Sequence, residues 1–444
     1  MDLYNRSLCY AKVGTSNVAL AYSNRSACFF HMRMYDEALV DIELAKKANI
    51  SDHLIPKLEH CEQESRTLRR IQKTPSKRPC QLSYESDDDF PCMVDVIKIK
   101  YNQELGRHLI ATRNIPAGET ILLEDSYVMA REDDRLVCHT CYRGNANFIA
   151  CEHCPDAIFC STYCKNTNPT HKWECDTFFE MVEIDMKFHI RAILIAIDTF
   201  ANVADLMQFV DHTLLEDSQN LPTSMHNPLS KYHFFFKLQK SEPKSSEVLL
   251  DISTLYRSMI ELPKIASVFN TLRKQRFLMH LVAHHFFVAS NNSIGNDSNT
   301  TIANIHSLLS HSCAPNTATY AAGNQRFSIT IRPIRKGQPL YMNYLHSIDD
   351  KPLNIRQAEL KSGWGFTCKC ENCVAGDKPI NIKHMMTDPC TRFLLINYSI
   401  EENYPIVLET CLKLLKKYKN QRWTIEMQIV AGILARIYKQ MFSF

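Results

Sequence analysis

The chain has 444 residues, of which 45% are hydrophobic and 22% charged, a balance typical of folded globular proteins. Its formal charge of +3 gives no strong signal for nucleic-acid binding, and its most apolar stretch, residues 188–210, is interrupted too often by charged residues to span a membrane. Since the opening residues lack the charged start and apolar core of a signal peptide, we expect the 18 cysteines to be zinc ligands or reduced thiols.

Residues 1–72 are predicted to be mainly helical. Between residues 17 and 70, apolar side chains recur at helical spacing, and the small residues Ala27 and Ala38 lie where two antiparallel helices would touch. The pattern resembles one tetratricopeptide helix pair followed by a capping helix, although any helical hairpin would show it. Because a single pair buries little surface, we expect it to pack on the rest of the chain. Residues 73–92, rich in proline, serine and charge, are predicted to be a linker.

A β-rich segment follows the linker. Residues 93–100 alternate between apolar and polar side chains, and residues 107–112 follow a glycine. A turn at residues 114–118 then precedes a short strand at residues 120–123. This spacing predicts the start of a β-rich core.

Eight residues between positions 138 and 175 have the spacing of metal ligands. Tetrahedral zinc is bound by thiolates and imidazoles, which this segment supplies in closely spaced pairs. Eight ligands make two closed sites with no position for a catalytic water, and zinc must stabilise a segment too short to bury its own core. The alternative, disulfides or chance, fits the spacing poorly. The predicted ligands are Cys138, Cys141, Cys151, Cys154, Cys160, Cys164, His171 and Cys175.

The second half of the chain changes between helical and β patterns. Apolar spacing, turn residues and asparagine content give the following order. We predict mainly helices over residues 177–290 with a polar interruption at 211–230, an asparagine-rich loop over 290–304, short strands around 327–332 and 340–344, and helices from 391 onward.

A third metal site is predicted from residues that are far apart in the sequence. The motif Cys368-Lys-Cys370-Glu-Asn-Cys373 offers three thiolates, one fewer than tetrahedral zinc requires. Cys313, which lies in the sequence Ser-His-Ser-Cys-Ala-Pro-Asn, is the natural fourth donor.

Together these motifs resemble the SET and MYND domain family of protein lysine methyltransferases. The eight-ligand segment, with its Phe159-Cys-Ser161 and His171-Lys-Trp-Glu-Cys175 sequences, is similar to the MYND finger, and the last three cysteines to the post-SET zinc site. The helical start resembles the tetratricopeptide-bearing fourth-member subfamily. The resemblance implies an α+β fold whose SET core is split by a zinc finger and a helical insert. The resemblance implies that the chain is divided into eight regions. These are a tetratricopeptide-like helical region (residues 1–72), a linker (73–92), the first part of the SET domain (93–137), the MYND finger (138–175), a helical insert (176–290), the second part of the SET domain (291–345), the post-SET zinc site (346–376) and a C-terminal helical, tetratricopeptide-like region (377–444).

The resemblance also implies how the metal ligands pair. In the MYND finger the pairs would cross, and with the post-SET site the chain would hold three zinc ions. One zinc would be bound by Cys138, Cys141, Cys160 and Cys164, and the other by Cys151, Cys154, His171 and Cys175.

The reaction that the resemblance implies is methyl transfer from S-adenosylmethionine to a lysine amine. The amine must be neutral, and both a narrow apolar channel and a nearby sulfonium favour that form. Tyr344 matches the catalytic tyrosine, although a strand tyrosine packed in the core is the alternative. Trp364 would be a second catalytic-site aromatic residue. The implied cofactor-binding residues are Arg107, His108, Asn292, Ser310, His311, Tyr344 and Phe366.

Three residues depart from the family's pattern and leave two hypotheses. His108 replaces a glycine and would add bulk at the edge of the cofactor. Ser310 replaces an asparagine and has a shorter reach. Trp364 replaces a tyrosine, and its indole cannot accept a hydrogen bond. The chain is therefore either a transferase for histone or non-histone proteins, or a catalytically weak or silent adaptor in transcriptional regulation.

Both hypotheses imply protein partners. The transferase requires a protein with a target lysine, and the MYND finger implies proline-rich peptides or deacetylase-complex proteins. We expect a monomer in the cytoplasm and nucleus, with no membrane association and no strong nucleic-acid signal.

Overall fold

The protein is described by a computed structural model of most of the chain. The described residues are 1–12, 14–48, 50–71, 78–132, 137–144, 147–177, 179, 182–217, 219–241, 246–296, 299–345, 351–376, 383–421 and 423–443. The predicted linker therefore begins outside them.

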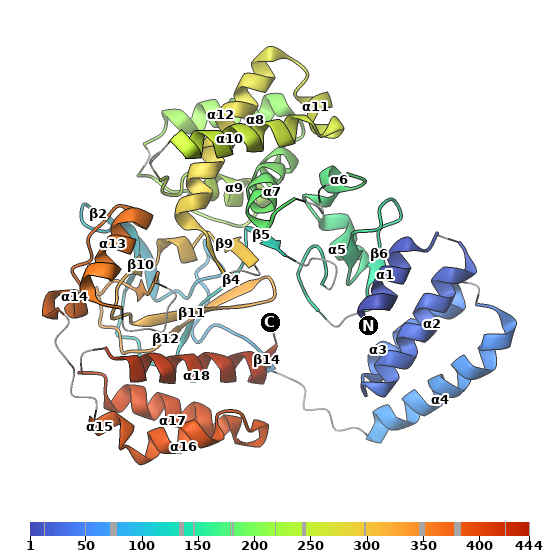
Figure 1. Cartoon of the computed structure of the whole chain (residues 1–444). Helices are drawn as coiled ribbons and strands as arrows, with labels where there is room; N and C mark the ends of the chain where they lie inside the picture. Colours follow the sequence, from blue (N-terminus) through green and yellow to red (C-terminus); the bar gives the residue numbers. More distant parts are fainter. Residues whose placement is uncertain are drawn as a thin grey trace.

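Helices form the N-terminal end of the protein, drawn in blue at the right of Figure 1. They are α1 (Asp2–Tyr10), α2 (Ser16–His31), α3 (Tyr35–Lys47), the short 3-10 helix η1 (Asp52–Leu54) and α4 (Ile55–Ile71). Helices α2 and α3 are the predicted pair, and the fully buried Ala38 allows them to approach closely. Helix α4 packs on α3 where a capping helix was expected. Helix α1 precedes the periodic segment 17–70 and packs on α2.

Short sheets form the centre of the molecule, and their strands come from both sides of the zinc-ligand segment and helical insert. They are β2 (Ile97–Asn102), β3 (Gly106–Ala111), β4 (Thr120–Asp125), β5 (Val128–Arg131), β8 (Ile294–Asn296), β9 (Asn299–Ile302), β10 (Ser310–His311), β11 (Thr317–Ala322), β12 (Gln325–Thr330) and β13 (Tyr341–Met342). The antiparallel order is β11-β12-β4 in one sheet and β5-β9-β8 in another. Asp125 lies opposite Gln325, so the two halves of the core are joined by backbone hydrogen bonds. This confirms the α+β fold with a split core.

Several strand predictions differ from the structure. The segment 290–304 is not simply a loop, because β8 and β9 lie within it and pair with each other and with β5. The strand predicted over 93–100 begins only at Ile97, and the one predicted over 340–344 is limited to Tyr341–Met342. Strand β11 was not predicted. In each case the pairing partner, rather than local composition, decides where the strand lies.

The helical insert packs above the sheets in Figure 1. It comprises α7 (Ile184–Thr199), α8 (Val203–Leu215), α9 (Pro228–Phe236), α10 (Ser246–Ile260), α11 (Pro263–Val268) and α12 (Leu272–Asn292). Helix α7 is buried on several sides, since it contacts β5, α10 and α12. Within the described part of the chain, no single helix has the length and apolarity to cross a membrane. Only α7 and α8 together meet those criteria, and they are bent by 102°.

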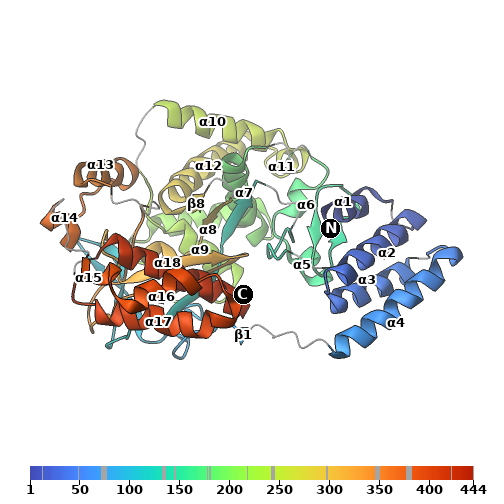
Figure 2. The same cartoon turned by 60° about the horizontal axis from the view of Figure 1, so that its bottom comes forward.

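A second group of helices covers the other side of the core, in front in Figure 2. These are α15 (Lys383–Met386), α16 (Pro389–Asn397), α17 (Tyr404–Lys417) and α18 (Ile425–Met441). Tyr320 of β11 donates a hydrogen bond to the carbonyl of Ala431 at 2.8 Å, and Tyr438 stacks on the buried Phe327. After α18, the short strand β14 (Phe442–Ser443) pairs in parallel with β1 (Arg78–Pro79). The helical pattern predicted from residue 391 therefore begins earlier and ends in a strand.

Buried Arg25 joins the N-terminal helices to the zinc-ligand segment. Its guanidinium contacts the Asp41 carboxylate through Nε at 2.6 Å and Nη2 at 2.7 Å. The same group donates to the side chain of Asn5 and, at 2.9 Å, to the carbonyl of Phe148. Asn147 also donates to Asp41 at 2.7 Å. The expected packing of the N-terminal helices on the rest of the chain therefore includes a charged, fully buried contact.

Two adjacent histidines of the helical insert pack against aromatic rings, His285 fully buried and His284 half-buried. His284 stacks on Phe236 with ring centroids 3.9 Å apart. His285 stacks on Tyr232, and its Nδ1–H donates to the carbonyl of Leu281 at 2.9 Å. Burial lowers the pKa of His284 to about 2 and that of His285 to about 3.

The free energy of unfolding is expected to fall as the pH drops through 6.5, the ordinary histidine pKa. Histidines in the unfolded chain then bind protons, whereas these two stay neutral in the folded protein, so acid favours unfolding. Between pH 7.5 and 5.5 each of the two histidines should lower the free energy of unfolding by about 1.4 kcal/mol. His284→Phe should recover that amount in urea unfolding compared at the two pH values. Phe236→Leu, the control, removes the same stacking and should destabilise equally at both; an unaltered pH dependence in His284→Phe would contradict the prediction.

Candidate active site and zinc centres

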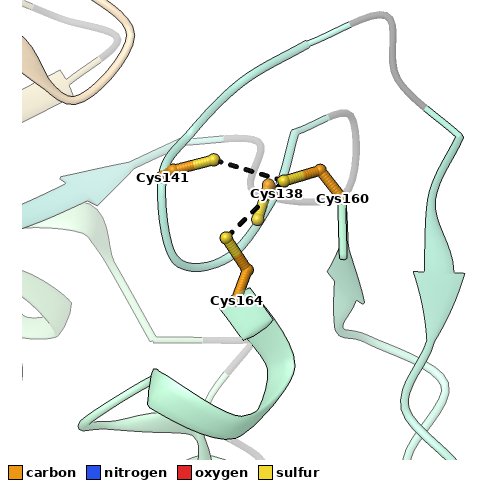
Figure 3. Close-up of side chains that lie close together, drawn as sticks. All are labelled: Cys138, Cys141, Cys160 and Cys164. Carbon is orange, nitrogen blue, oxygen red and sulfur yellow. Dashed lines mark hydrogen bonds between the residues drawn. The ribbon is translucent and has the colours of Figure 1, made fainter. Parts of the chain in front are cut away.

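The first zinc centre is formed by Cys138, Cys141, Cys160 and Cys164, shown in Figure 3. The sulfurs of Cys141 and Cys160 are 3.5 Å apart, and those of Cys160 and Cys164 are 3.6 Å apart. Four sulfurs about 2.3 Å from a central zinc would be separated by about 3.8 Å, whereas a disulfide requires about 2.05 Å. The donors therefore fit zinc rather than disulfides.

Local backbone features position these cysteines. The turn after Cys138 places Tyr142 at a φ of 55°, and its N–H donates to the Cys138 carbonyl at 2.8 Å. The Tyr142 hydroxyl is anchored by a hydrogen bond to the carbonyl of Met129 on β5. Helix α5 (Thr162–Thr167) is capped by Ser161, whose hydroxyl accepts from the N–H of Cys164 at 3.1 Å.

The second centre combines Cys151, Cys154, His171 and Cys175. The hairpin of β6 (Ile149–Ala150) and β7 (Ile158–Phe159) presents the first two ligands, and the short helix α6 (His171–Glu174) presents the others. The Sγ atoms of Cys151 and Cys175 lie 3.8 Å apart, as do Cys154 Sγ and His171 Nε2. The structure thus brings the eight ligands together in the two crossed groups predicted.

The third centre joins Cys313 to Cys368, Cys370 and Cys373. Cys313 Sγ lies 3.6 Å from Cys373 Sγ. The three late cysteines follow α13 (Leu353–Trp364) and flank the start of α14 (Glu371–Ala375). Gln357 of α13 holds both the N–H and the carbonyl of Cys368, at 2.9 and 2.8 Å. Gln357 was not predicted, and the sequence has no motif that would have indicated it.

A large cavity of about 1920 Å³ lies beside the third centre. Seven of the eight residues that the motifs predicted to bind cofactor or act in catalysis line it, namely Arg107, Asn292, Ser310, His311, Tyr344, Trp364 and Phe366. The Asn292 side chain donates to the carbonyls of Gln239 and Val288, each at 2.7 Å, at the end of α12. The Arg107 guanidinium donates to the carbonyl of Lys237, and burial lowers the pKa of Arg107.

His108 is the one predicted residue outside the cavity lining. Its side chain is 3% exposed, and its Nδ1–H donates to the carbonyl of Gly106 at 2.9 Å. The structure therefore does not place the imidazole where it was expected to crowd the cofactor. The chain turns at Gly106, which has a φ of 64°, and this brings the Gly106 carbonyl within reach of the His108 ring.

Tyr344 and His311 are positioned by the parallel pair β10 and β13. The Tyr344 hydroxyl donates to the Leu309 carbonyl at 2.6 Å, and burial raises the pKa of the phenol. His311 Nδ1 accepts from the backbone N–H of Tyr344 at 3.0 Å, so a neutral imidazole carries its proton on Nε2. That nitrogen lies 3.4 Å from Cys313 Sγ. His311 thus connects the tyrosine backbone to the third zinc centre.

Aromatic rings surround the Tyr344 phenol. The rings of Trp364 and His311 each lie 5.2 Å from it, and that of Phe366 lies 6.4 Å from it. Helix α13 ends at Trp364 because Gly365 adopts a φ of 79°, which turns the chain so that Phe366 also reaches the cavity. Aromatic faces here can bind a planar base or a cationic group.

Comparison with known proteins identifies the family. A SET domain model matches residues 106–345, more than half of the chain. The chain belongs to the SET domain family. It is 24% identical over 479 residues to the protein-lysine N-methyltransferase SMYD4 of Danio rerio, covering 83% of this chain and 62% of that protein. Identity to human SMYD4 is 22% over 513 residues, covering 84% and 64% of the two chains.

Further similarities extend to the zinc-finger proteins of the family. A SET and MYND domain-containing protein of Dictyostelium discoideum is 24% identical over 322 residues, which cover 62% of this chain and 81% of that protein. These matches confirm the resemblance to SET and MYND domain proteins. The solved structure of Rubisco LSMT bound to AdoMet aligns with a TM-score of 0.31 and 12% identity, covering 78% of this chain and 84% of that chain. This SET-domain chain spans less than two thirds of the length of its SMYD4 relatives.

Proposed function

We propose that this protein transfers a methyl group from S-adenosylmethionine to a lysine side chain of another protein. The observation that carries the proposal is the cavity in which Tyr344, His311, Trp364 and Phe366 meet. The SMYD4 relatives, which bear the name protein-lysine N-methyltransferase, support it.

The cavity residues suit both reactants. The Phe366 ring offers a face for a purine, and the Ser310 hydroxyl and the Asn292 amide oxygen lie at the same cavity for the polar part of the cofactor. When bound, S-adenosylmethionine would supply its methyl group as a sulfonium: the lysine nitrogen forms the new bond, the methyl–sulfur bond breaks, and its electron pair stays on sulfur. The methylated nitrogen then carries one extra proton, which it releases to solvent.

The aromatic end of the cavity would prepare the lysine amine. Exclusion of water by Tyr344, Trp364 and Phe366 disfavours the ammonium form, so the amine would be neutral when it reaches the methyl group. The Tyr344 phenol, fixed by its hydrogen bond to Leu309, would hold the amine in line with that group. Trp364 would serve as an apolar wall, a role that does not require a hydrogen-bond acceptor.

The zinc finger offers a surface for protein partners. We propose that proline-rich or deacetylase-complex proteins would bind the finger on the side of α5, where Tyr163 is exposed. Other parts of the finger, through β6, Asn147 and Phe148, contact the N-terminal helices. Action in the cytoplasm and nucleus is proposed on the same basis of intracellular protein partners.

The test is calorimetric titration of the zinc-loaded protein with S-adenosylmethionine, followed by transfer assays on a lysine peptide library. Cofactor binding is expected, and Tyr344→Phe should bind it normally while losing at least about tenfold in transfer rate, equivalent to about 1.4 kcal/mol of the barrier. Tyr320→Phe is the matched control, because it removes a phenol–carbonyl hydrogen bond outside the cavity. Absence of cofactor binding up to millimolar concentration would reject the transferase; unaltered transfer in Tyr344→Phe would reject its catalytic role.

A further inference from the structure

The cavity beside Tyr344 is larger than one cofactor requires. Its volume of about 1920 Å³ exceeds the roughly 300–1000 Å³ of pockets that hold a single small molecule. Besides the residues already described, three segments far apart in the sequence line it, at residues 332–338, 369–371 and 419–420. The cavity therefore has room for a second ligand in contact with these segments.

A basic rim belongs to these three segments, and we define it as Arg332, Arg335, Lys336, Lys369 and Lys419. The last four side chains are exposed. Arg332 joins the segments, since it contacts the Glu371 carboxylate at 2.8 Å and the Lys419 carbonyl at 3.4 Å. Among the described residues of these segments, Glu371 is the only acidic one, and it is already paired with Arg332.

The charge of the rim is a local feature of this cavity. The whole chain has 51 basic and 48 acidic residues, close to neutrality. At the rim, in contrast, five cations meet one carboxylate that is already paired, and the rest of the cavity lining adds the acidic Glu104 and the basic Arg107 and Lys240, so positive charge remains in excess. Charges of one sign lining a concave surface attract a ligand of the opposite sign, because the protein wall focuses the field.

We propose that the second ligand is a protein segment whose acceptor lysine is flanked by aspartate and glutamate. That the acceptor is a lysine rests on the proposed function, whereas the preference for acidic neighbours is inferred from the positive charge of the rim. The aromatic end of the cavity receives the lysine, and the rim binds the neighbouring carboxylates. A segment rich in arginine and lysine is repelled by the same charges, so strongly basic tails are disfavoured substrates.

The test uses fluorescence anisotropy with the full, zinc-loaded chain and three labelled peptides. Each has one central lysine, flanked by acidic residues, by serine and glycine, or by arginine. At low salt the acidic peptide should bind at least tenfold more tightly than the neutral one, and the arginine peptide more weakly than either. Added salt should remove the preference, because exposed charges are screened over about 8 Å at physiological ionic strength.

Matched charge reversals locate the effect. Lys336→Glu with Lys369→Glu should weaken binding of the acidic peptide at least tenfold. Lys413→Glu with Lys416→Glu makes the same change of charge on exposed positions of α17 that do not line the cavity, and should leave binding within twofold of wild type.

Each contrary result has a separate meaning. Equal binding of the acidic and arginine peptides, or equal effects of the two double variants, would overturn the proposal. The proposal would also be overturned if single-stranded DNA bound more tightly than the acidic peptide and this binding were lost in Lys336→Glu/Lys369→Glu. The basic rim would then be a nucleic-acid site. Peptide binding is measured without methyl transfer. Failure of cofactor binding would therefore reject the transferase function, while anisotropy would still show whether the basic rim binds acidic peptides.

Discussion

Replacing Cys313 by serine is expected to lower the zinc content from three to two per chain and to abolish binding of S-adenosylmethionine. Cys313 is one of the four ligands of the third centre, and structural zinc contributes about 10–16 kcal/mol to the folding of such sites. Without the metal, residues 368–373 lose their link to Cys313, and the contacts of Gln357 with Cys368 and of Arg332 with Glu371 contribute much less than the zinc. Metal analysis and calorimetry would measure the two losses.

Cys390→Ser is the control for this prediction. Cys390 is half-buried and belongs to none of the three cysteine clusters found in the described chain. This variant should keep three zinc ions and bind the cofactor as wild type does. Three zinc ions in Cys313→Ser would show that Cys313 is not a ligand, and two in the wild-type protein would remove one of the centres altogether.

The second large effect is expected at Arg25. Arg25→Ala should destabilise the contact between α2, α3 and the zinc finger by about 3–5 kcal/mol, because the buried Asp41 carboxylate loses its charged partner. Hydrogen exchange should then report loss of protection in α2 and α3, while the central strands remain protected. The exposed pair Arg66–Glu62 offers a matched control, and Arg66→Ala should cost at most about 0.5 kcal/mol.

A double variant tests the physical cause. Arg25→Met together with Asp41→Leu removes both charges and should recover part of the loss, since apolar replacements of a buried ion pair are often tolerated. Equal hydrogen exchange in Arg25→Ala and wild type would mean that other contacts hold the N-terminal helices to the finger.

The zinc centres were predictable because metal-ligand spacing is a short-range property. Cys138 and Cys141, like Cys368 and Cys370, are read directly from neighbouring positions, and counting donors was enough to add the distant Cys313. The cavity residues depended instead on family resemblance, because no local pattern connects Asn292 with Phe366.

The remaining features depend on contacts between distant residues. Arg25 occupies a helical position that a surface charge could equally occupy, and its partner Phe148 lies 123 positions away. Strand β9 pairs with β5, far earlier in the sequence, as well as with β8, despite its asparagine-rich surroundings. Local propensity contains little information about such partners.

The pairing of Asp125 with Gln325 has a consequence for the order of folding during synthesis. Strand β4 leaves the ribosome long before β12, and closing so long a loop is entropically costly and slow. The zinc finger, in contrast, needs only its own consecutive residues and a metal ion. On a nascent chain the finger and the N-terminal helices that contact it would therefore be complete while the edge of β4 is still unpaired. During that interval the exposed strand is a site for chaperone binding or aggregation.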